Sequence, residues 1–351
     1  MVTATEIQDA TVEALFQDLE RSGVRYALLR NYERFPQFGH DIDLVMAAED
    51  MAPWRDVARA VARRFEWDAL TECRHWAQSR EPLHRVHVFR FYRRAPMAFL
   101  EVDLFHGYSL WGLPLAGEAA VLAGRRPDAA GRFTHVDPCD EHGAHMLQMR
   151  RLMRFAQTEA KLARYRDKIL RFYEANPDAF NQWLLRFYGP AGVKALRALM
   201  EGDFRAFGQR MSQTQRDVLR RRFARAPLRS ARQMLARAVD LAWTYGRNPC
   251  GFVLPVDAPL QSDRASLLTA LEALARTNVL IGFTAQRAHR RGLSWGERQL
   301  MERGGAVIKW TKSGAPGAFC VDPGEPQDGL AQRLLQRCMD RHPPIWTRSS
   351  P

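Results

Sequence analysis

The sequence lacks the features that would place it in a membrane or outside the cell. It has no run of about eighteen or more apolar residues, the length that a transmembrane helix needs. Its N-terminus, MVTATEIQDATVEALF, has no basic segment followed by an apolar one, so no secretion signal is predicted. The five cysteines are scattered, odd in number and without CxxC spacing, which indicates reduced thiols and no structural zinc. We therefore expect a cytoplasmic protein.

Acidic residues are also scarce relative to basic ones, and the formal net charge is +13. Between residues 205 and 247, eleven arginines are opposed only by Asp217 and Asp240, so this segment holds most of the excess. Apolar residues interleave with these arginines at helical spacing, which predicts an amphipathic basic helix. A solvated helical face, an acidic partner and an anionic membrane surface remain alternatives. Nucleic acid is not an expected partner, because no basic and aromatic residues alternate as in nucleic-acid-binding motifs.

What is present indicates a folded chain of about two or three domains, since 46% of the 351 residues are hydrophobic and 10% aromatic. Periodicity predicts a helix at 6–22, strands at 24–29 and 41–46, a helix at 51–65 and strands at 85–94 and 97–105. The first two strands are expected to form a hairpin-like pair. This order predicts an α/β (α+β) fold with a mixed sheet and helices.

The chain divides by composition into three expected domains: 1–136, which holds these strands, a helical arginine-rich domain at 137–246, and a small α/β domain at 247–351. The second begins at Asp137-Pro138, a helix N-cap followed by proline at the first helical position. The linker GRNPCG precedes the third. The tail HPPIWTRSSP is expected to be frayed.

Two predicted strands carry paired carboxylates. Side chains alternate across a strand, so Asp41 and Asp43 in DIDLVM share one face, and Glu101 and Asp103 in AFLEVDLF share one face. If the two strands are neighbours, three or four carboxylates converge at one place. Carboxylates this close repel one another unless a cation or protons intervene, and Mg²⁺ prefers such oxygen ligands. The pattern predicts a two-metal phosphoryl-transfer site, and two solvated acidic strand faces are the alternative.

The stretches LLRNYERFPQFGHDIDLVM and FLEVDLFHGYSLWG resemble the nucleotidyltransferase superfamily, in particular the uncharacterised bacterial subgroup linked to glycan biosynthesis. The resemblance covers about residues 8–150. Its Asp-x-Asp pair falls on Asp41 and Asp43, and its third acid on Asp103, with Glu101 as second choice. Where the wider superfamily has Gly-Ser, this sequence has Arg30 and Asn31. We therefore expect the Arg30 guanidinium, and not backbone N–H groups, to contact the phosphate oxygens.

The resemblance implies nucleotidyl transfer from an NTP to a hydroxyl, phosphate or glycan acceptor, with two Mg²⁺ ions as cofactor. Asp41, Asp43 and Asp103 would be catalytic and hold the metals, whereas Arg30, Asn31 and Glu101 would contact substrate or nucleotide. A basic run on a later helix is a candidate lining of a triphosphate groove, or a solvated face: Lys161, Arg164, Tyr165, Arg166 and Lys168. The rival hypothesis is a non-catalytic protein that keeps the fold and docks on a membrane or a partner enzyme.

The C-terminal stretch RNPCGFVLPVDAPLQSDRASLLTAL is similar to a thymidylate-kinase-like P-loop domain. Arg264 stands where the P-loop lysine is expected, and Ser266 stands at the metal-binding hydroxyl. The glycines that let backbone N–H groups wrap a phosphate are missing, and Asp263 would repel phosphate. We therefore expect a degenerate, non-catalytic remnant, with a simple α/β structural unit as the alternative.

Overall fold

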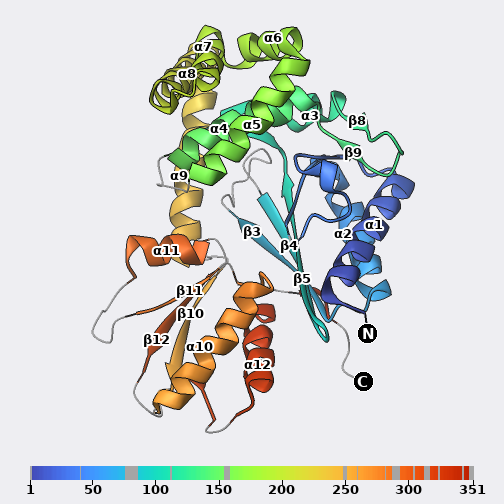
Figure 1. Ribbon diagram of the computed structural model, residues 1–351, viewed down its shortest axis with the longest axis vertical. Helices are drawn as coiled ribbons and strands as arrows, with labels where there is room; N and C mark the ends of the chain where they lie inside the picture. Colours follow the sequence, from blue (N-terminus) through green and yellow to red (C-terminus); the bar gives the residue numbers. More distant parts are fainter. Residues whose placement is uncertain are drawn as a thin grey trace.

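The computed structural model describes residues 2–39, 41–75, 86–110, 113–153, 159–247, 251–258, 260–280, 282–286, 293–302, 305–311, 317–322, 325–341 and 344–347. Figure 1 shows a central sheet with α1 and α2 on one side, a group of helices above it and a smaller α/β unit below. The fold is mixed α/β, as the sequence predicts.

The central sheet has eight strands in the order β14-β3-β4-β5-β2-β1-β9-β8. The elements of this part, in chain order, are α1 (Ala4–Ser22), β1 (Tyr26–Leu28), the short 3-10 helix η1 (Tyr32–Arg34), β2 (Asp41–Met46), the 3-10 helix η2 (Ala48–Asp50), α2 (Met51–Arg64), β3 (Ala69–His75), β4 (Val86–Arg94), β5 (Met97–Phe105), β6 (Gly107–Leu110), β7 (Leu113–Gly117), α3 (Glu118–Ala123), β8 (Arg126–Pro127) and β9 (Thr134–His135). The expected pair of β1 and β2 is confirmed, because they are antiparallel neighbours with Leu28 opposite Leu44.

One face of this sheet is a continuous apolar core with α1 and α2. Ile42 and Leu44 on β2, with Val102 on β5, belong to this buried cluster. Trp54 of α2 and Phe16 of α1 contribute the helix side. The alternation of side chains along a strand then places the neighbouring acidic residues on the opposite face.

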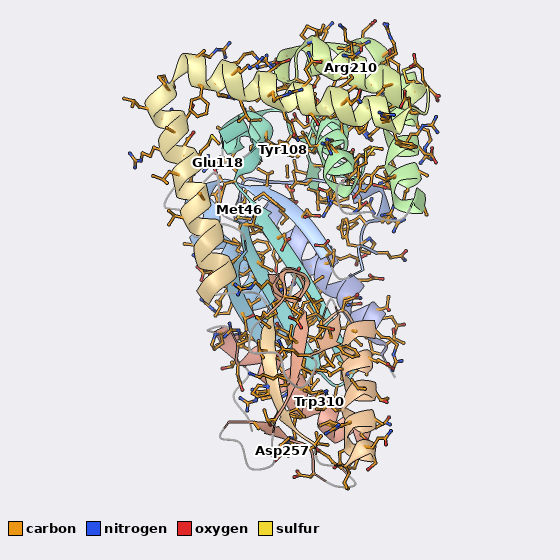
Figure 2. The ribbon with its side chains drawn as sticks, turned by 90° about the vertical axis from the view of Figure 1, so that its left-hand side faces the viewer. Met46, Tyr108, Glu118, Arg210, Asp257 and Trp310 are labelled. Atoms are coloured by element: carbon orange, nitrogen blue, oxygen red, sulfur yellow. The ribbon has the colours of Figure 1, made fainter. Side chains whose placement is uncertain are left out.

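The helical part packs above the sheet and around its own apolar core (Figure 1). It consists of α4 (Pro138–Met153), α5 (Glu159–Ala175), α6 (Pro177–Phe187), α7 (Pro190–Met200), α8 (Phe204–Arg225) and α9 (Pro227–Arg247). The predicted start of α4 is confirmed: the Asp137 carboxylate accepts a hydrogen bond from the Cys139 N–H at 2.8 Å. Figures 1 and 2 show α9 running along one edge of the molecule from the helical part toward the C-terminal unit. Within the described residues, no helix combines the length and the apolar character needed to cross a bilayer.

The C-terminal unit is a parallel four-stranded sheet in the order β11-β12-β10-β13, covered by helices. Its elements are β10 (Phe252–Asp257), α10 (Gln261–Arg276), β11 (Phe283–Ala285), α11 (Trp295–Glu302), β12 (Ala306–Trp310), β13 (Phe319–Cys320) and α12 (Gln327–Met339). Its core is continuous with the central sheet, because Tyr92 and Phe99 belong to the same buried cluster as Leu334. The domain boundaries at residues 136 and 246 stay predictions.

The C-terminal tail corrects one expectation. Residues 344–347 are not frayed but form β14 (Pro344–Thr347), which adds to the edge of the central sheet beside β3. The reason is that β3 offers unpaired backbone groups at this edge. Ile345 and Trp346 also pack against the core under α1 and α2.

Candidate functional site: a carboxylate cluster

The acidic residues of β2 and β5 meet because these strands are parallel neighbours. Their register places Asp41 opposite Glu101 and Asp43 opposite Asp103. The sequence-based condition that the two strands lie side by side is therefore met. Four carboxylates occupy two alternate rungs, on either side of the Ile42–Val102 pair, on the sheet face away from α1 and α2.

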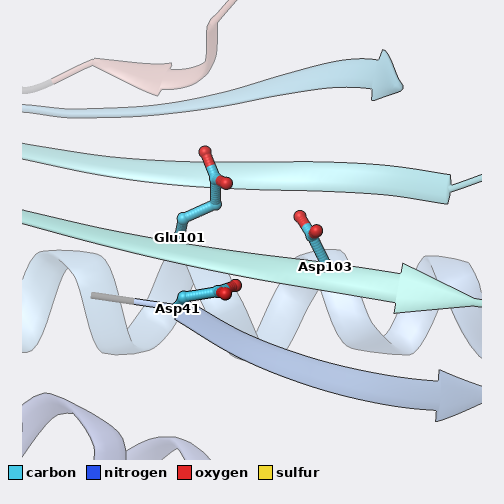
Figure 3. Close-up of side chains that lie close together, drawn as sticks. All are labelled: Asp41, Glu101 and Asp103. Carbon is cyan, nitrogen blue, oxygen red and sulfur yellow. The ribbon is translucent and has the colours of Figure 1, made fainter. Parts of the chain in front are cut away.

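Three of the four carboxylates form the tightest group. One oxygen from each of Asp41, Glu101 and Asp103 lies within 4.8 Å of the others. Figure 3 shows these side chains projecting from the two strands into a common space. In the described part of the chain, this is the group of acids, histidines or cysteines whose geometry suits a metal ion.

Two oxygens of this group are buried without a hydrogen-bond partner among the described residues: Asp41 Oδ1 and Asp103 Oδ1. A buried carboxylate oxygen in this condition loses its hydration without compensation. The Glu101 carboxylate differs, because it accepts a hydrogen bond from Arg90 Nε at 2.7 Å. An all-carboxylate donor set with two free oxygens fits a hard divalent cation such as Mg²⁺.

The electrostatics of the cluster favour protonation while no cation neutralises it. Burial, followed by the neighbouring Asp43 carboxylate, raises the pKa of Asp41 to about 8, and Arg30 opposes this shift. Burial and the carboxylates of Glu101, Asp41 and Asp43 raise the pKa of Asp103 well above its ordinary value. The cluster therefore holds protons near neutral pH or needs a cation in their place.

Asp43 differs from the other three acids because it forms a close ion pair with Arg30. It is 4% exposed, and its Oδ2 accepts a short hydrogen bond from Arg30 Nε. The Arg30 Nη2 also lies 3.7 Å from Asp41 Oδ2. Arg30 is the second residue after β1, and the pairing of β1 with β2 brings its guanidinium to this place. The Leu29 N–H donates to the Asp43 carbonyl at 2.9 Å. Arg30 thus contacts the carboxylates here, and its phosphate-binding role stays a prediction.

The residues that follow Arg30 connect the cluster to the helical part. Asn31 adopts a left-handed conformation with φ of 59°. Lys168 of α5 donates to Asn31 Oδ1 at 3.3 Å and to Glu33 Oε1 at 2.6 Å. The Tyr32 hydroxyl donates to the Glu141 carboxylate of α4. The segment Arg-Asn-Tyr-Glu therefore links the carboxylates, through Arg30, to α4 and α5, through Asn31, Tyr32 and Glu33.

The carboxylates lie in a polar band between two apolar clusters. Along β5, Phe99 packs in the core shared with the C-terminal unit, and Phe105 packs against the cluster formed with α3. Glu101 and Asp103 lie between them on the same face. Along β5 the acids therefore lie between the apolar contacts to the C-terminal unit and those to α3.

Two residues of the site were missed by sequence reasoning. Arg90 pairs with Glu101 across β4 and β5, and Glu141 contacts the loop after β1. In the sequence, Arg90 is one of several basic residues on the same strand. Glu141 lies in the first turn of α4, where an acidic residue is explained by the helix dipole. Neither had a local signal, because both become relevant only through contacts distant in sequence.

Two histidines near the site are structural in this fold. His142 stacks on Phe172 at 4.3 Å between ring centroids, and the His145 ring lies 4.9 Å from that of Tyr165. Burial lowers the pKa of His142 to about 4 and that of His145 to about 2. Both imidazoles therefore stay neutral at physiological pH as part of the helical core.

The charged residues in the first turn of α10 make local structural contacts. Arg264 Nε donates to the Ala258 carbonyl at 3.0 Å, and its guanidinium lies 5.1 Å from the Trp310 ring centroid. Asp263 is buried and accepts from the Leu260 N–H at 3.4 Å. These contacts give both residues a role in joining β10 to α10.

If the carboxylate cluster binds Mg·NTP, we expect Arg264→Ala to leave that binding unchanged, because Arg264 lies in the other sheet unit. The substitution removes a hydrogen bond and a cation–π contact, together about 1–2 kcal/mol of stability. Isothermal titration with Mg·NTP and a thermal melt measure the two quantities. ATP-dependent phosphorylation of a nucleoside monophosphate that disappears in Arg264→Ala would show a working P-loop instead.

Comparison with known proteins gives little beyond this geometry. No protein-family model matches the chain, and no curated protein matches its sequence. Among solved structures, it is similar to an antigenic nucleotidyltransferase-like protein from Paracoccidioides brasiliensis. The sequence identity is 14% and the TM-score 0.32, and the match covers 58% of this chain and 94% of that one.

Proposed function

We propose that this protein is a Mg²⁺-dependent nucleotidyltransferase that uses an NTP and a hydroxyl or phosphate acceptor. The observation that carries the proposal is the pairing of β2 with β5, which gathers Asp41, Glu101 and Asp103 with two unpartnered buried oxygens. The resemblance of the Arg-Asn-Tyr-Glu and Asp-Ile-Asp segments to nucleotidyltransferases supports the same reading and suggests an acceptor from glycan biosynthesis.

Asp41, Asp103 and Glu101 would hold a first metal ion. Asp43 would become a ligand of a second ion when the Arg30 guanidinium moves away from its carboxylate. The metal would neutralise charge on the NTP phosphates. In the reaction, an acceptor oxygen attacks the α-phosphorus, and the bond from that phosphorus to the bridging oxygen of the β-phosphate breaks to release pyrophosphate.

The chain's own residues supply the remaining functions. Asp103 is the candidate base for the acceptor proton, because it lies in the cluster with Asp41 and Glu101, where the acceptor hydroxyl would be bound. Arg30 reaches both Asp41 and Asp43 and offers a planar fork to phosphate oxygens when the metal takes its place. Lys168, next to Asn31, adds a second positive charge on the α5 side.

The test is pyrophosphate release from each of the four NTPs with Mg²⁺ and an acceptor mixture of sugars, sugar phosphates and nucleosides. We expect release for at least one NTP, its loss with EDTA, and full activity in Asp56→Asn, which changes an acid that is 74% exposed on α2. Mg·NTP binding without any transfer would favour the non-catalytic alternative. Absence of both binding and transfer would overturn the proposal.

A further inference from the structure

The corner between α8 and α9 combines exposed leucines with clustered arginines. Leu228, in the first turn of α9, is 87% exposed. Leu235 and Val239 on the same helix are 66% and 59% exposed. A soluble surface helix normally turns its large apolar residues inward, so these three side chains require an explanation.

The three residues form one stripe. On a helix of about 3.6 residues per turn, positions 228, 235 and 239 fall within about 40° of one another. The buried residues Ser230 and Gln233 lie on the opposite side of α9, toward the protein. The outward side of α9 therefore carries these three apolar residues together with the exposed Arg232.

Exposed arginines precede and follow Leu228 in the chain. Arg220 and Arg225 at the end of α8 and Arg229 on α9 are exposed. Burial lowers the pKa of Arg222. Repulsion from the nearby charges of Arg225, Arg221 and Arg229 lowers this pKa further. Over residues 204–232, Asp217 is the one acidic residue. A positive surface of this density attracts an extended anionic surface.

We propose that the α8–α9 corner docks on an anionic lipid bilayer, with Leu228, Leu235 and Val239 entering the interface and the arginines contacting lipid phosphates. The combination of an apolar stripe with flanking basic residues is the pattern of helices that lie in a membrane interface. A second copy of this chain fits less well, because its corner would bring the same positive charge. Nucleic acid fits less well too, because the stripe is aliphatic and offers no ring for stacking on bases.

The experiment is flotation of the full chain with vesicles of neutral phosphatidylcholine and with vesicles containing anionic phosphatidylglycerol. We expect binding to the anionic vesicles alone, lost at high salt because the Debye length shortens. The charge-neutral variant Leu228→Gln/Leu235→Gln/Val239→Thr is expected to bind at least tenfold more weakly, and Arg225→Gln/Arg229→Gln also more weakly. Leu260→Gln, an exposed leucine in the C-terminal unit, is the matched control and should bind as wild type.

Three results would overturn the proposal. One is no binding to anionic vesicles at low salt by a protein whose thermal melt shows it folded. Another is vesicle binding that is unchanged in the apolar triple variant and that a short RNA duplex displaces. That result would indicate general binding to polyanions. The third is a dimer in sedimentation that the triple variant abolishes, which would assign the stripe to a second copy. The membrane proposal is independent of the catalytic one, so neither failure decides the other.

Discussion

Asp103→Asn and Asp41→Asn are each expected to reduce Mg²⁺-dependent NTP affinity by at least about 100-fold, the upper end of what loss of a supporting residue costs a metal site. Each substitution removes a buried carboxylate oxygen that has no partner among the described side chains, and with it one negative charge of the donor set. Isothermal titration with Mg·NTP, and with NTP in EDTA, measures the loss. An amide keeps the size of the side chain, so the change is one of charge and donor strength.

Asp56→Asn serves as the control for this series, because it removes an exposed acid from α2 and keeps the cluster intact. Its Mg·NTP affinity should equal that of the wild type. Unchanged affinity in both Asp41→Asn and Asp103→Asn would end the metal-site hypothesis. A fall in NTP affinity that is equally large in EDTA would instead assign the two acids to nucleotide contacts without metal.

The same substitutions are expected to stabilise the metal-free protein, in a pH-dependent way. The pKa of Asp41 is about 8 in the folded chain, against an ordinary value of 3.8. Between these two values the folded state binds more protons than the unfolded state, so its stability falls as pH rises and levels off above about 8. An Asn side chain does not ionise, so it does not cause this loss of folding stability at high pH. In EDTA, we expect the Tm of Asp41→Asn and Asp103→Asn to exceed that of the wild type by about 2–4 °C at pH 8.

At pH 5, near the lower end of this window, Asp41 is still protonated in the folded state and only a small part of the stability loss has developed, so the advantage of Asp41→Asn and Asp103→Asn in Tm should be smaller than at pH 8. A Tm difference that stays constant from pH 5 to pH 8 would contradict the raised pKa of both acids. Differential scanning fluorimetry across this pH range measures the difference directly.

Asp43→Asn should behave in the opposite way, although it stands only two residues from Asp41. Asp43 is the nearer partner of Arg30, and its removal leaves this partly buried guanidinium with only the longer contact to Asp41. Because the Arg30 side chain is 28% exposed, we expect a loss of about 2 kcal/mol, below the cost for a fully buried pair. A higher Tm for Asp43→Asn at pH 8 would show that the Arg30 contact contributes little.

The sequence by itself determined which residues share a face. The alternation in DIDLVM and FLEVDLF placed the acids of each strand together and the apolar residues in the core, because side-chain direction in a strand has a local period of two. The start of α4 at Asp137-Pro138 was equally local, since capping depends on neighbouring residues. The arginine excess of residues 205–247 was readable by counting.

Only the tertiary structure decided how these pieces meet. The parallel register of β2 and β5 set Asp41 against Glu101, so Glu101 joins Asp41 and Asp103 in the tight group while Asp43 pairs with Arg30. Register between strands about sixty residues apart depends on the packing of everything between them, which no local pattern encodes. The addition of β14 to the edge beside β3 and the outward turn of Leu228 have the same origin: each depends on which surfaces the rest of the chain leaves uncovered.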